Sequence, residues 1–263
     1  MSTVTVDVPE AALPFGFLNS RNAAATSRTL MLSELRTLLG AVPPTFSQVD
    51  LRRAVVDENI LQKPTVATRQ RTLQYLTDRY TLDDSVPLFR ALRVLWAADE
   101  QAQPVMALLC AAARDPILRA SADVILSRQV GDVVGGVDFS KVLAEVFPGA
   151  YSAQTLKDTG ARLTSSWVQS GHVSGARTKV RSRPVVRPVL VAYALLLGHL
   201  CQEGAESLFQ TFWAQLLDVP AYEVRELAVE ASRQGWIELR QGGNATNVGF
   251  RHLLPELETR GPR

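Results

Sequence analysis

Apolar side chains recur at intervals of three and four residues along most of the chain, the spacing that places them on one face of an α-helix. In the first part of the chain this pattern predicts helices over residues 28–39 and 47–59, and a third that starts at Thr65. Gly40 is placed to cap the end of the first helix and Ser47 to cap the start of the second. Prolines at first-turn positions, where the missing N–H costs nothing, predict three more helices. These cover residues 87–98, 104–113 and 116–129.

The second half of the chain continues with helical patterns but ends differently. Its predicted helices cover about residues 140–146, 153–169, 189–202, 206–217 and 221–234. Apolar and polar residues then alternate over 236–240, a Gly-Gly-Asn turn follows at 242–244, and a second short extended run covers 248–250, which together predict a β-hairpin. Helix, helix, hairpin is the order of a winged-helix domain. The sequence therefore predicts an all-α protein with a winged-helix-like end.

Glycine and proline interrupt the helical pattern near the middle of the chain. Three glycines occur between residues 131 and 136, and Pro148-Gly149 makes a second break. We therefore expect a domain boundary near Ala150. Residues 1–150 would form a helical domain with a helix-turn-helix-like pair, and residues 151–263 a helical domain that carries the winged-helix-like end.

Composition excludes some classes of protein. The chain has 263 residues, 46% of them apolar, which is enough to bury a sizeable core. Its most apolar run, residues 188–201, is shorter than the roughly 20 residues of a membrane-spanning helix. The N-terminus lacks the basic start and apolar run of a secretory signal. We expect a cytoplasmic protein without a membrane partner, whose cysteines, Cys110 and Cys201, are buried thiols.

No motif in the chain predicts catalysis. GDVVGG at residues 131–136 lacks the spacing of a dinucleotide-binding loop, and GHVSG at residues 171–175 has its serine one position away from that of a nucleophile elbow. The three histidines are far apart, and only His199 has a potential metal ligand nearby, Cys201, which points in another direction on a helix. We expect no catalytic residue, no metal site, no cofactor and no small-molecule substrate.

The stretch VVDENILQKPTVATRQRTLQYLTDRY, residues 55–80, predicts two helices that meet at residues 60–64. The second helix begins with threonines and basic residues, where free backbone N–H groups favour an anion. If the pair is a helix-turn-helix, Lys63, Arg69 and Arg71 are candidate phosphate contacts. If it is a packing corner, the threonines cap the helix and the arginines are only solvated. Three leucines are expected to be buried, Leu61, Leu73 and Leu76, and the three cations are expected to be exposed.

The strongest charge asymmetry lies in residues 177–187, which we call the basic segment. No acidic residue occurs between Asp158 and Glu203. Four of the cations in the basic segment lie two residues apart, so an extended backbone would place them on one side, facing an anion. The candidate contacts are Arg177, Lys179, Arg181, Arg183 and Arg187. The alternative is a solvated linker.

Two stretches resemble those of a known family. Residues 55–80, preceded by a short N-terminal helix, resemble the hallmark region of BrxA proteins, the small helical components of BREX phage-defence systems. YSAQTLKDTGARLTSSWVQSGHV, residues 151–173, resembles the second helical signature of the family. The resemblance implies an all-helical body similar to the NusB antitermination factor. It also implies a non-enzymatic role beside the methyltransferase and ATPase of the defence system, and an ability to bind DNA.

Two functions are compatible with the sequence. The first is a non-catalytic DNA-binding accessory protein that contacts the phosphates of duplex DNA and has other BREX components as protein partners. The second is an RNA-binding or protein-bridging module of the NusB type. Recognition of single-stranded RNA usually needs exposed aromatic rings, and the basic regions contain almost none, which favours duplex DNA.

Overall fold

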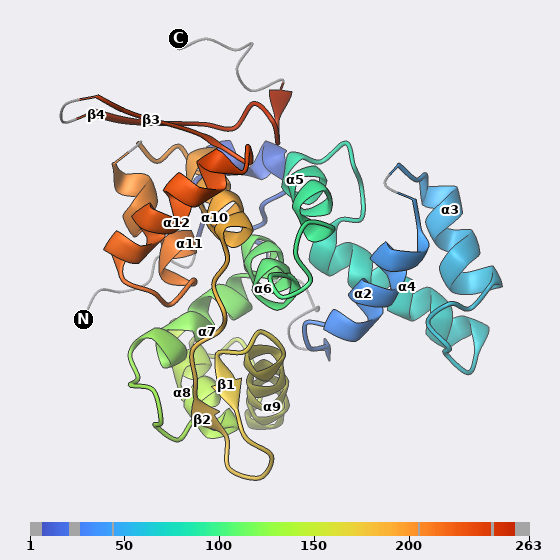
Figure 1. Ribbon diagram of the computed structural model, residues 1–263. Helices are drawn as coiled ribbons and strands as arrows, with labels where there is room; N and C mark the ends of the chain where they lie inside the picture. Colours follow the sequence, from blue (N-terminus) through green and yellow to red (C-terminus); the bar gives the residue numbers. More distant parts are fainter. Residues whose placement is uncertain (1–6, 21–26, 44, 205, 243–244, 256–263) are drawn as a thin grey trace.

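The computed structural model is mostly helical (Figure 1) and describes residues 7–20, 27–43, 45–204, 206–242 and 245–255. Its first part contains the 3₁₀-helix η1 (Glu10–Phe15), α2 (Leu32–Ala41), α3 (Gln48–Arg52), the π-helical turn η2 (Arg53–Asp57) and α4 (Val66–Tyr80). The middle contains α5 (Pro87–Trp96), α6 (Gln103–Arg114), α7 (Pro116–Leu126), α8 (Gly136–Val146) and α9 (Ala153–Gln169). Two short strands, β1 (Val173–Ser174) and β2 (Val180–Arg181), follow. The last part contains α10 (Pro188–Leu200), η3 (Ser207–Gln210), α11 (Phe212–Gln215), α12 (Ala221–Arg233), β3 (Glu238–Gly242) and β4 (Ala245–Gly249).

Helices α6, α7 and α10 form the centre of the molecule (Figure 1). All residues of α10 except Pro188 and His199 are buried, and α10 packs against α5, α6, α11 and α12. Full burial of a leucine stabilises the fold by roughly 1.5–3 kcal/mol, and α10 alone buries several. The run at residues 188–201 is therefore a core helix, as expected. Among the described residues, no helix combines the length and apolarity needed to cross a bilayer.

Helices α8 and α9 cross at very short distance, because each contributes a glycine to the contact. A Cβ atom added to Gly160 would lie 2.2 Å from the carbonyl oxygen of Gly136 and 2.6 Å from Oγ of Ser140. The Ser140 hydroxyl donates to the carbonyl oxygen of Leu156 at 2.9 Å, which ties the two helices together. These helices lie on either side of the boundary expected near Ala150, and the division into two domains stays a prediction.

Several predicted elements have different bounds in the structure. The first predicted helix begins and ends later, as α2, and Gly40 is not its cap: the helix continues to Ala41 and ends at an extended Val42. The helix predicted near 140–146 starts earlier, at Gly136, where Asp138 accepts the N–H of Gly135. The helix predicted over 206–217 is divided into η3 and α11, because Thr211 has an extended backbone and caps α11 with its hydroxyl.

The predicted C-terminal hairpin is confirmed. Strands β3 and β4 pair antiparallel, with Glu238 opposite Gly249 and Gly242 opposite Ala245, directly after α12 (Figure 1). Gly243 and Asn244 of the predicted turn lie outside the described residues. The winged-helix-like assignment of this end stays a prediction.

Candidate nucleic-acid interface

The basic segment begins in a β-hairpin that the sequence analysis did not predict. Strands β1 and β2 pair antiparallel, with Val173 opposite Arg181 and Ser174 opposite Val180. The other edge of β2 is also paired, because the N–H of Arg181 donates to the carbonyl oxygen of Asp132 at 2.8 Å and Val133 forms a bridge with Val180. The signal in the sequence was the turn residue Gly175 between the two apolar positions Val173 and Val180. The loop that joins the strands lies at the lower edge of the molecule in Figure 1.

The loop of this hairpin, residues 175–179, is held in one shape by two features. Gly175 has a φ of +97°, and a Cβ atom there would lie 2.1 Å from the carbonyl oxygen of Thr178, so only glycine fits. The ammonium of Lys179 donates to the carbonyl oxygens of Gly175 and Ala176 at 2.5 and 3.0 Å. Lys179 therefore closes its own loop, and its charge lies beside the tip of the hairpin.

Arg181 does not share an exposed edge with the other cations of the basic segment, and that expectation was wrong. Its side chain is 2% exposed, and Nη2 lies 2.7 Å from Oδ1 of Asp218. Its Nε donates to the carbonyl oxygen of Ile125 at 2.9 Å, and Nη1 donates to those of His172, at 3.2 Å, and Ser182. The reason is that β2 is paired on both edges and lies against the protein body, so alternate side chains face inward. Arg181 anchors the hairpin and does not reach solvent.

The histidine beside this anchor is neutral. His172 is fully buried, and its Nε2 lies 2.9 Å from the carbonyl oxygen of Leu216, which can only accept, so Nε2 carries the ring proton. Nδ1 lies 2.9 Å from the hydroxyl of Ser170. Burial, with a smaller contribution from the nearby Arg181 guanidinium, lowers the pKa of His172 to about 3, although the hydrogen bond to the Leu216 carbonyl opposes the shift. His172 is therefore a structural group that joins the β1–β2 hairpin to the chain around α11.

Arg187, at the other end of the basic segment, is also engaged. Its Nε lies 2.7 Å from Oδ2 of Asp99, and this ion pair lowers the pKa of the Asp99 carboxyl below its usual value although partial burial opposes the shift. Arg177 and Arg183 are exposed, and no hydrogen bond or ion pair joins either of them to any residue that the structure describes. Of the five predicted contacts, Arg177, Lys179 and Arg183 thus remain available to an anion.

The helix pair at residues 55–80 is present, with the first helix ending in the π-helical turn η2. Asn59 has a φ of +54°, and its Oδ1 accepts the N–H of Lys63 at 2.8 Å, which shapes the turn before α4. Thr65 caps α4 by accepting the N–H of Thr68. Leu61 and Leu76 are buried as expected, whereas Leu73 is only half-buried against the core.

Two of the three cations predicted as contacts in this pair have partners within the protein. Lys63 forms an ion pair with Glu34 at 2.9 Å, and its side chain is 27% exposed. Arg69 donates from Nη1 to the carbonyl oxygen of Val56 at 3.0 Å and from Nε to that of Lys63 at 3.2 Å, so it caps the π-helical turn and the loop. Arg71 is exposed and has no partner among the described residues. The expectation that all three cations are exposed was therefore wrong for Lys63 and Arg69.

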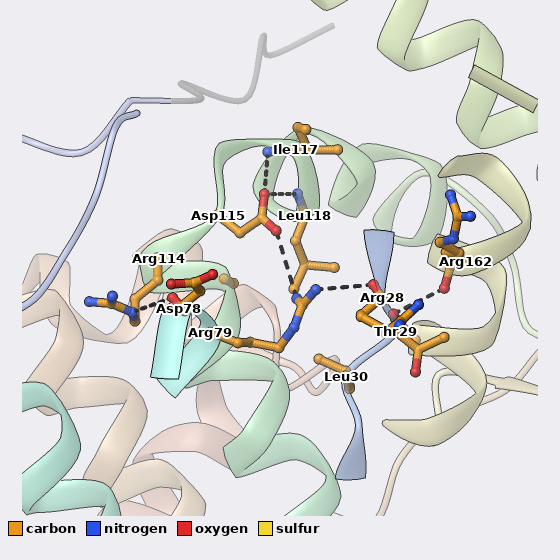
Figure 2. A network of polar contacts seen from close by, with 12 residues as sticks. Arg28, Thr29, Leu30, Asp78, Arg79, Arg114, Asp115, Ile117, Leu118 and Arg162 are labelled. Carbon is orange, nitrogen blue, oxygen red and sulfur yellow. Dashed lines mark hydrogen bonds and ion pairs between the residues drawn. The ribbon is translucent and has the colours of Figure 1, made fainter. Parts of the chain in front are cut away.

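The far end of α4 is embedded in the protein (Figure 2). Arg79 is 2% exposed, with Nη1 3.7 Å from Oδ2 of Asp115 and Nη2 donating to the carbonyl oxygen of Arg28 at 3.0 Å. Asp115 also caps α7 by accepting the N–H groups of Ile117 and Leu118, and burial raises the pKa of its carboxyl although Arg79 opposes this. The last two residues of α4 are therefore closed to a partner, whereas Arg71 lies on an exposed part of the helix.

The two candidate surfaces are separate. Figure 1 shows α3 and α4 at one side of the molecule and the β1–β2 hairpin at its lower edge, so the structure does not bring Arg71 together with Arg177 and Arg183. Within the described ranges, no three His, Cys, Asp or Glu side chains are grouped so that they could hold a metal ion. Both cysteines are free and buried, as expected.

These features define a mostly helical protein with two candidate contact surfaces. One is the basic β1–β2 hairpin, which is anchored to the protein body, and the other is the exposed part of α4. The BrxA family model matches residues 22–130, which include α3, η2 and α4. The match confirms the resemblance to the BrxA family seen in residues 55–80. The second stretch that resembles the family, residues 151–173, lies beyond the matched residues, and no curated protein matches the chain.

Proposed function

We propose that this protein is a non-catalytic accessory component of a BREX-type phage-defence system that binds duplex DNA mainly through backbone phosphates. The observation that carries the proposal is two exposed arginines without a partner among the described residues: Arg177 at the tip of the β1–β2 hairpin and Arg183 just after it. Lys179 of the same loop adds a third positive charge. Phosphate contacts made by arginine and lysine dominate the affinity of proteins for DNA. The BrxA match to residues 22–130 supports the same assignment.

Fewer residues are proposed as DNA contacts than were predicted from the sequence. Arg181 and Arg187 are anchors, held by Asp218 and Asp99, and Lys63 and Arg69 stabilise the turn before α4. Arg71 forms a second candidate contact on the exposed part of α4. A NusB-like body, a winged-helix-like end, a cytoplasmic location and protein partners among the other BREX components belong to the same proposal.

A salt titration tests this function. The logarithm of affinity should fall with the logarithm of salt concentration at a slope of about −0.9 for each phosphate engaged. Arg177→Ala and Arg183→Ala should each weaken binding to two unrelated duplexes by similar factors and flatten the slope by about one unit. Asp132→Asn, which removes an exposed carboxylate beside β2, should tighten binding to both duplexes.

The control is Arg233→Ala, which removes an exposed arginine from α12, away from the β1–β2 hairpin (Figure 1); Arg233 differs from Arg177 and Arg183 in forming an ion pair with Glu230, at 3.5 Å. It should leave both affinity and slope unchanged. Equal effects of all three arginine variants would show that only net charge matters. Absence of duplex binding, or stronger binding to structured RNA, would overturn the proposal in favour of the NusB-type alternative.

A further inference from the structure

The hairpin of β1 and β2 has a narrow tip with one long cationic side chain. Arg177 lies at the middle of the five-residue loop, and its neighbours are small: Ser174, Gly175, Ala176 and Thr178. All of these residues are exposed. A tip of this kind can approach closely between two phosphate strands, because no bulky or acidic side chain stands beside the arginine.

The hairpin is also anchored more firmly than its length suggests. Its base is tied to the protein body by the Arg181–Asp218 ion pair at 2.7 Å, and the hydroxyl of Ser182 donates to the carbonyl oxygen of Gly171 at 2.9 Å. Its tip is closed by Lys179 and requires glycine at position 175. An anchored arm loses little conformational freedom when it binds, which favours a defined contact over a diffuse one.

The length of the hairpin decides which groove it can enter. Only residues 175–179 extend beyond the last paired residues, Ser174 and Val180, and the neighbouring segment pairs with β2 as far as Lys179. The major groove is about 12 Å wide and 8.5 Å deep, and an α-helix or two-stranded β-ribbon that reads it lies inside the groove. This short arm has too little free length for that. The minor groove, about 6 Å wide, admits a single side chain, and narrow A·T-rich minor grooves attract arginine through their enhanced negative potential.

We propose that the β1–β2 hairpin contacts DNA at the minor groove, with Arg177 as the inserted side chain. The inference rests on the proposed duplex binding and adds to it the groove, the residue and a preference for A·T-rich sites. Lys179, held beside the tip, and Arg183, beyond the base, contact phosphates on the flanking backbone.

The test compares three duplexes of equal length: one with a central A-tract, one with central G·C pairs and one with central inosine·cytosine pairs. Inosine lacks the 2-amino group of guanine, so an I·C pair resembles A·T in the minor groove and G·C in the major groove. The wild-type protein should bind the A-tract and I·C duplexes at least about fivefold more tightly than the G·C duplex, the factor typical of one base-pair contact. Binding of I·C at the level of G·C, or equal binding of all three, would overturn the inference.

Variants of the hairpin and its flank test whether the preference for the A-tract and I·C duplexes depends on Arg177. Arg177→Ala should abolish the difference between the duplexes, whereas Arg183→Ala should weaken binding to all three and preserve their ratio. Gly175→Val keeps every charge but distorts the tip, so it should also abolish the difference; thermal melting should show a cooperative transition at a lowered melting temperature, which separates a distorted loop from an unfolded protein. An unchanged ratio in folded Arg177→Ala protein would assign the preference elsewhere. Loss of all duplex binding by the wild type would instead refute the proposed function, so the two failures are distinguishable.

Discussion

The guanidinium of Arg181 lies 2.7 Å from the carboxylate of Asp218, and the pair joins β2 to the chain that follows α11. Arg181 is 2% exposed, and the Asp218 side chain is 15% exposed. Asp218 has a φ of +59°, a conformation that aspartate and asparagine tolerate better than most residues. The ion pair therefore fixes the orientation of a surface hairpin from within the protein.

Replacement of one partner of this pair should destabilise the fold strongly. Arg181→Ala leaves the Asp218 carboxylate largely buried without a counter-charge, so we expect a loss of about 3–5 kcal/mol in the free energy of unfolding, measured by urea titration. Arg183→Ala, two residues away and exposed, should change it by less than about 0.5 kcal/mol. Similar values for the two variants would mean that the Arg181 contacts contribute little to stability.

Stability should depend on pH through His172. Burial holds the folded pKa at about 3, below the ordinary value of 6.5, so the unfolded chain takes up the proton first as pH falls. The stability that the neutral ring provides is fully present above pH 6.5 and decreases toward pH 3, by up to about 1.4 kcal/mol per pH unit. In urea titrations at several pH values, His172→Gln should be less stable at neutral pH but lose stability less steeply on acidification. Parallel pH profiles would show that another group dominates.

Because α8 and α9 approach closely at Gly160, replacement of this glycine by alanine should destabilise the protein, whereas the same replacement at Gly40 should stabilise it. Gly160→Ala would place a methyl group 2.2 Å from the carbonyl oxygen of Gly136, so the helices must separate, at a cost of about 1–3 kcal/mol. Gly40→Ala, in α2, meets nothing within 4 Å and should stabilise the helix by about 0.5–1 kcal/mol. Thermal melting of both variants checks this, and a melting temperature for Gly160→Ala equal to that of the wild type would show that the crossing is looser.

Arg69 and Arg71 separate the two interpretations of the helix pair. Arg69→Ala leaves the carbonyl oxygens of Val56 and Lys63 without their charged donor and should cost about 1.5–3 kcal/mol of stability. Arg71→Ala should change stability by less than about 0.5 kcal/mol. If α4 contacts DNA, the Arg71 variant alone should weaken duplex binding while it remains fully folded. Unchanged binding by Arg71→Ala would identify the pair as a packing corner.

Much of the helical framework could be predicted from the sequence because its signals are local. Ser47 and Thr65 cap the helices that follow them, and Pro87, Pro104 and Pro116 lie in first turns as expected. Each of these signals acts within one turn of helix, so it needs no knowledge of distant residues. The prediction that Gly40 caps the first helix was wrong, because α2 continues through Gly40 to Ala41 and ends without a left-handed residue.

The basic segment shows where local information ends. The backbone is extended at Val180–Arg181, as the placement of four cations on one edge assumed, but that edge is not exposed to solvent along its length. The partners of β2 and Arg181 are contributed by residues 131–134 and Asp218, which no local pattern connects with the basic segment. Whether a given arginine binds solvent or a buried carboxylate depends on such distant partners.

The sequence by itself determined where most helices begin, that α10 is buried, and that positive charge is concentrated in residues 177–187, since these follow from composition, period and caps. The tertiary structure alone decided which cations are free. Arg177 and Arg183 have no partner among the described residues, whereas the buried Arg181 is paired with Asp218 and the exposed Arg187 with Asp99, which are 37 and 88 residues away along the chain. The physical reason is that a charge buried on folding must find its counter-charge in space, and sequence spacing does not encode that distance.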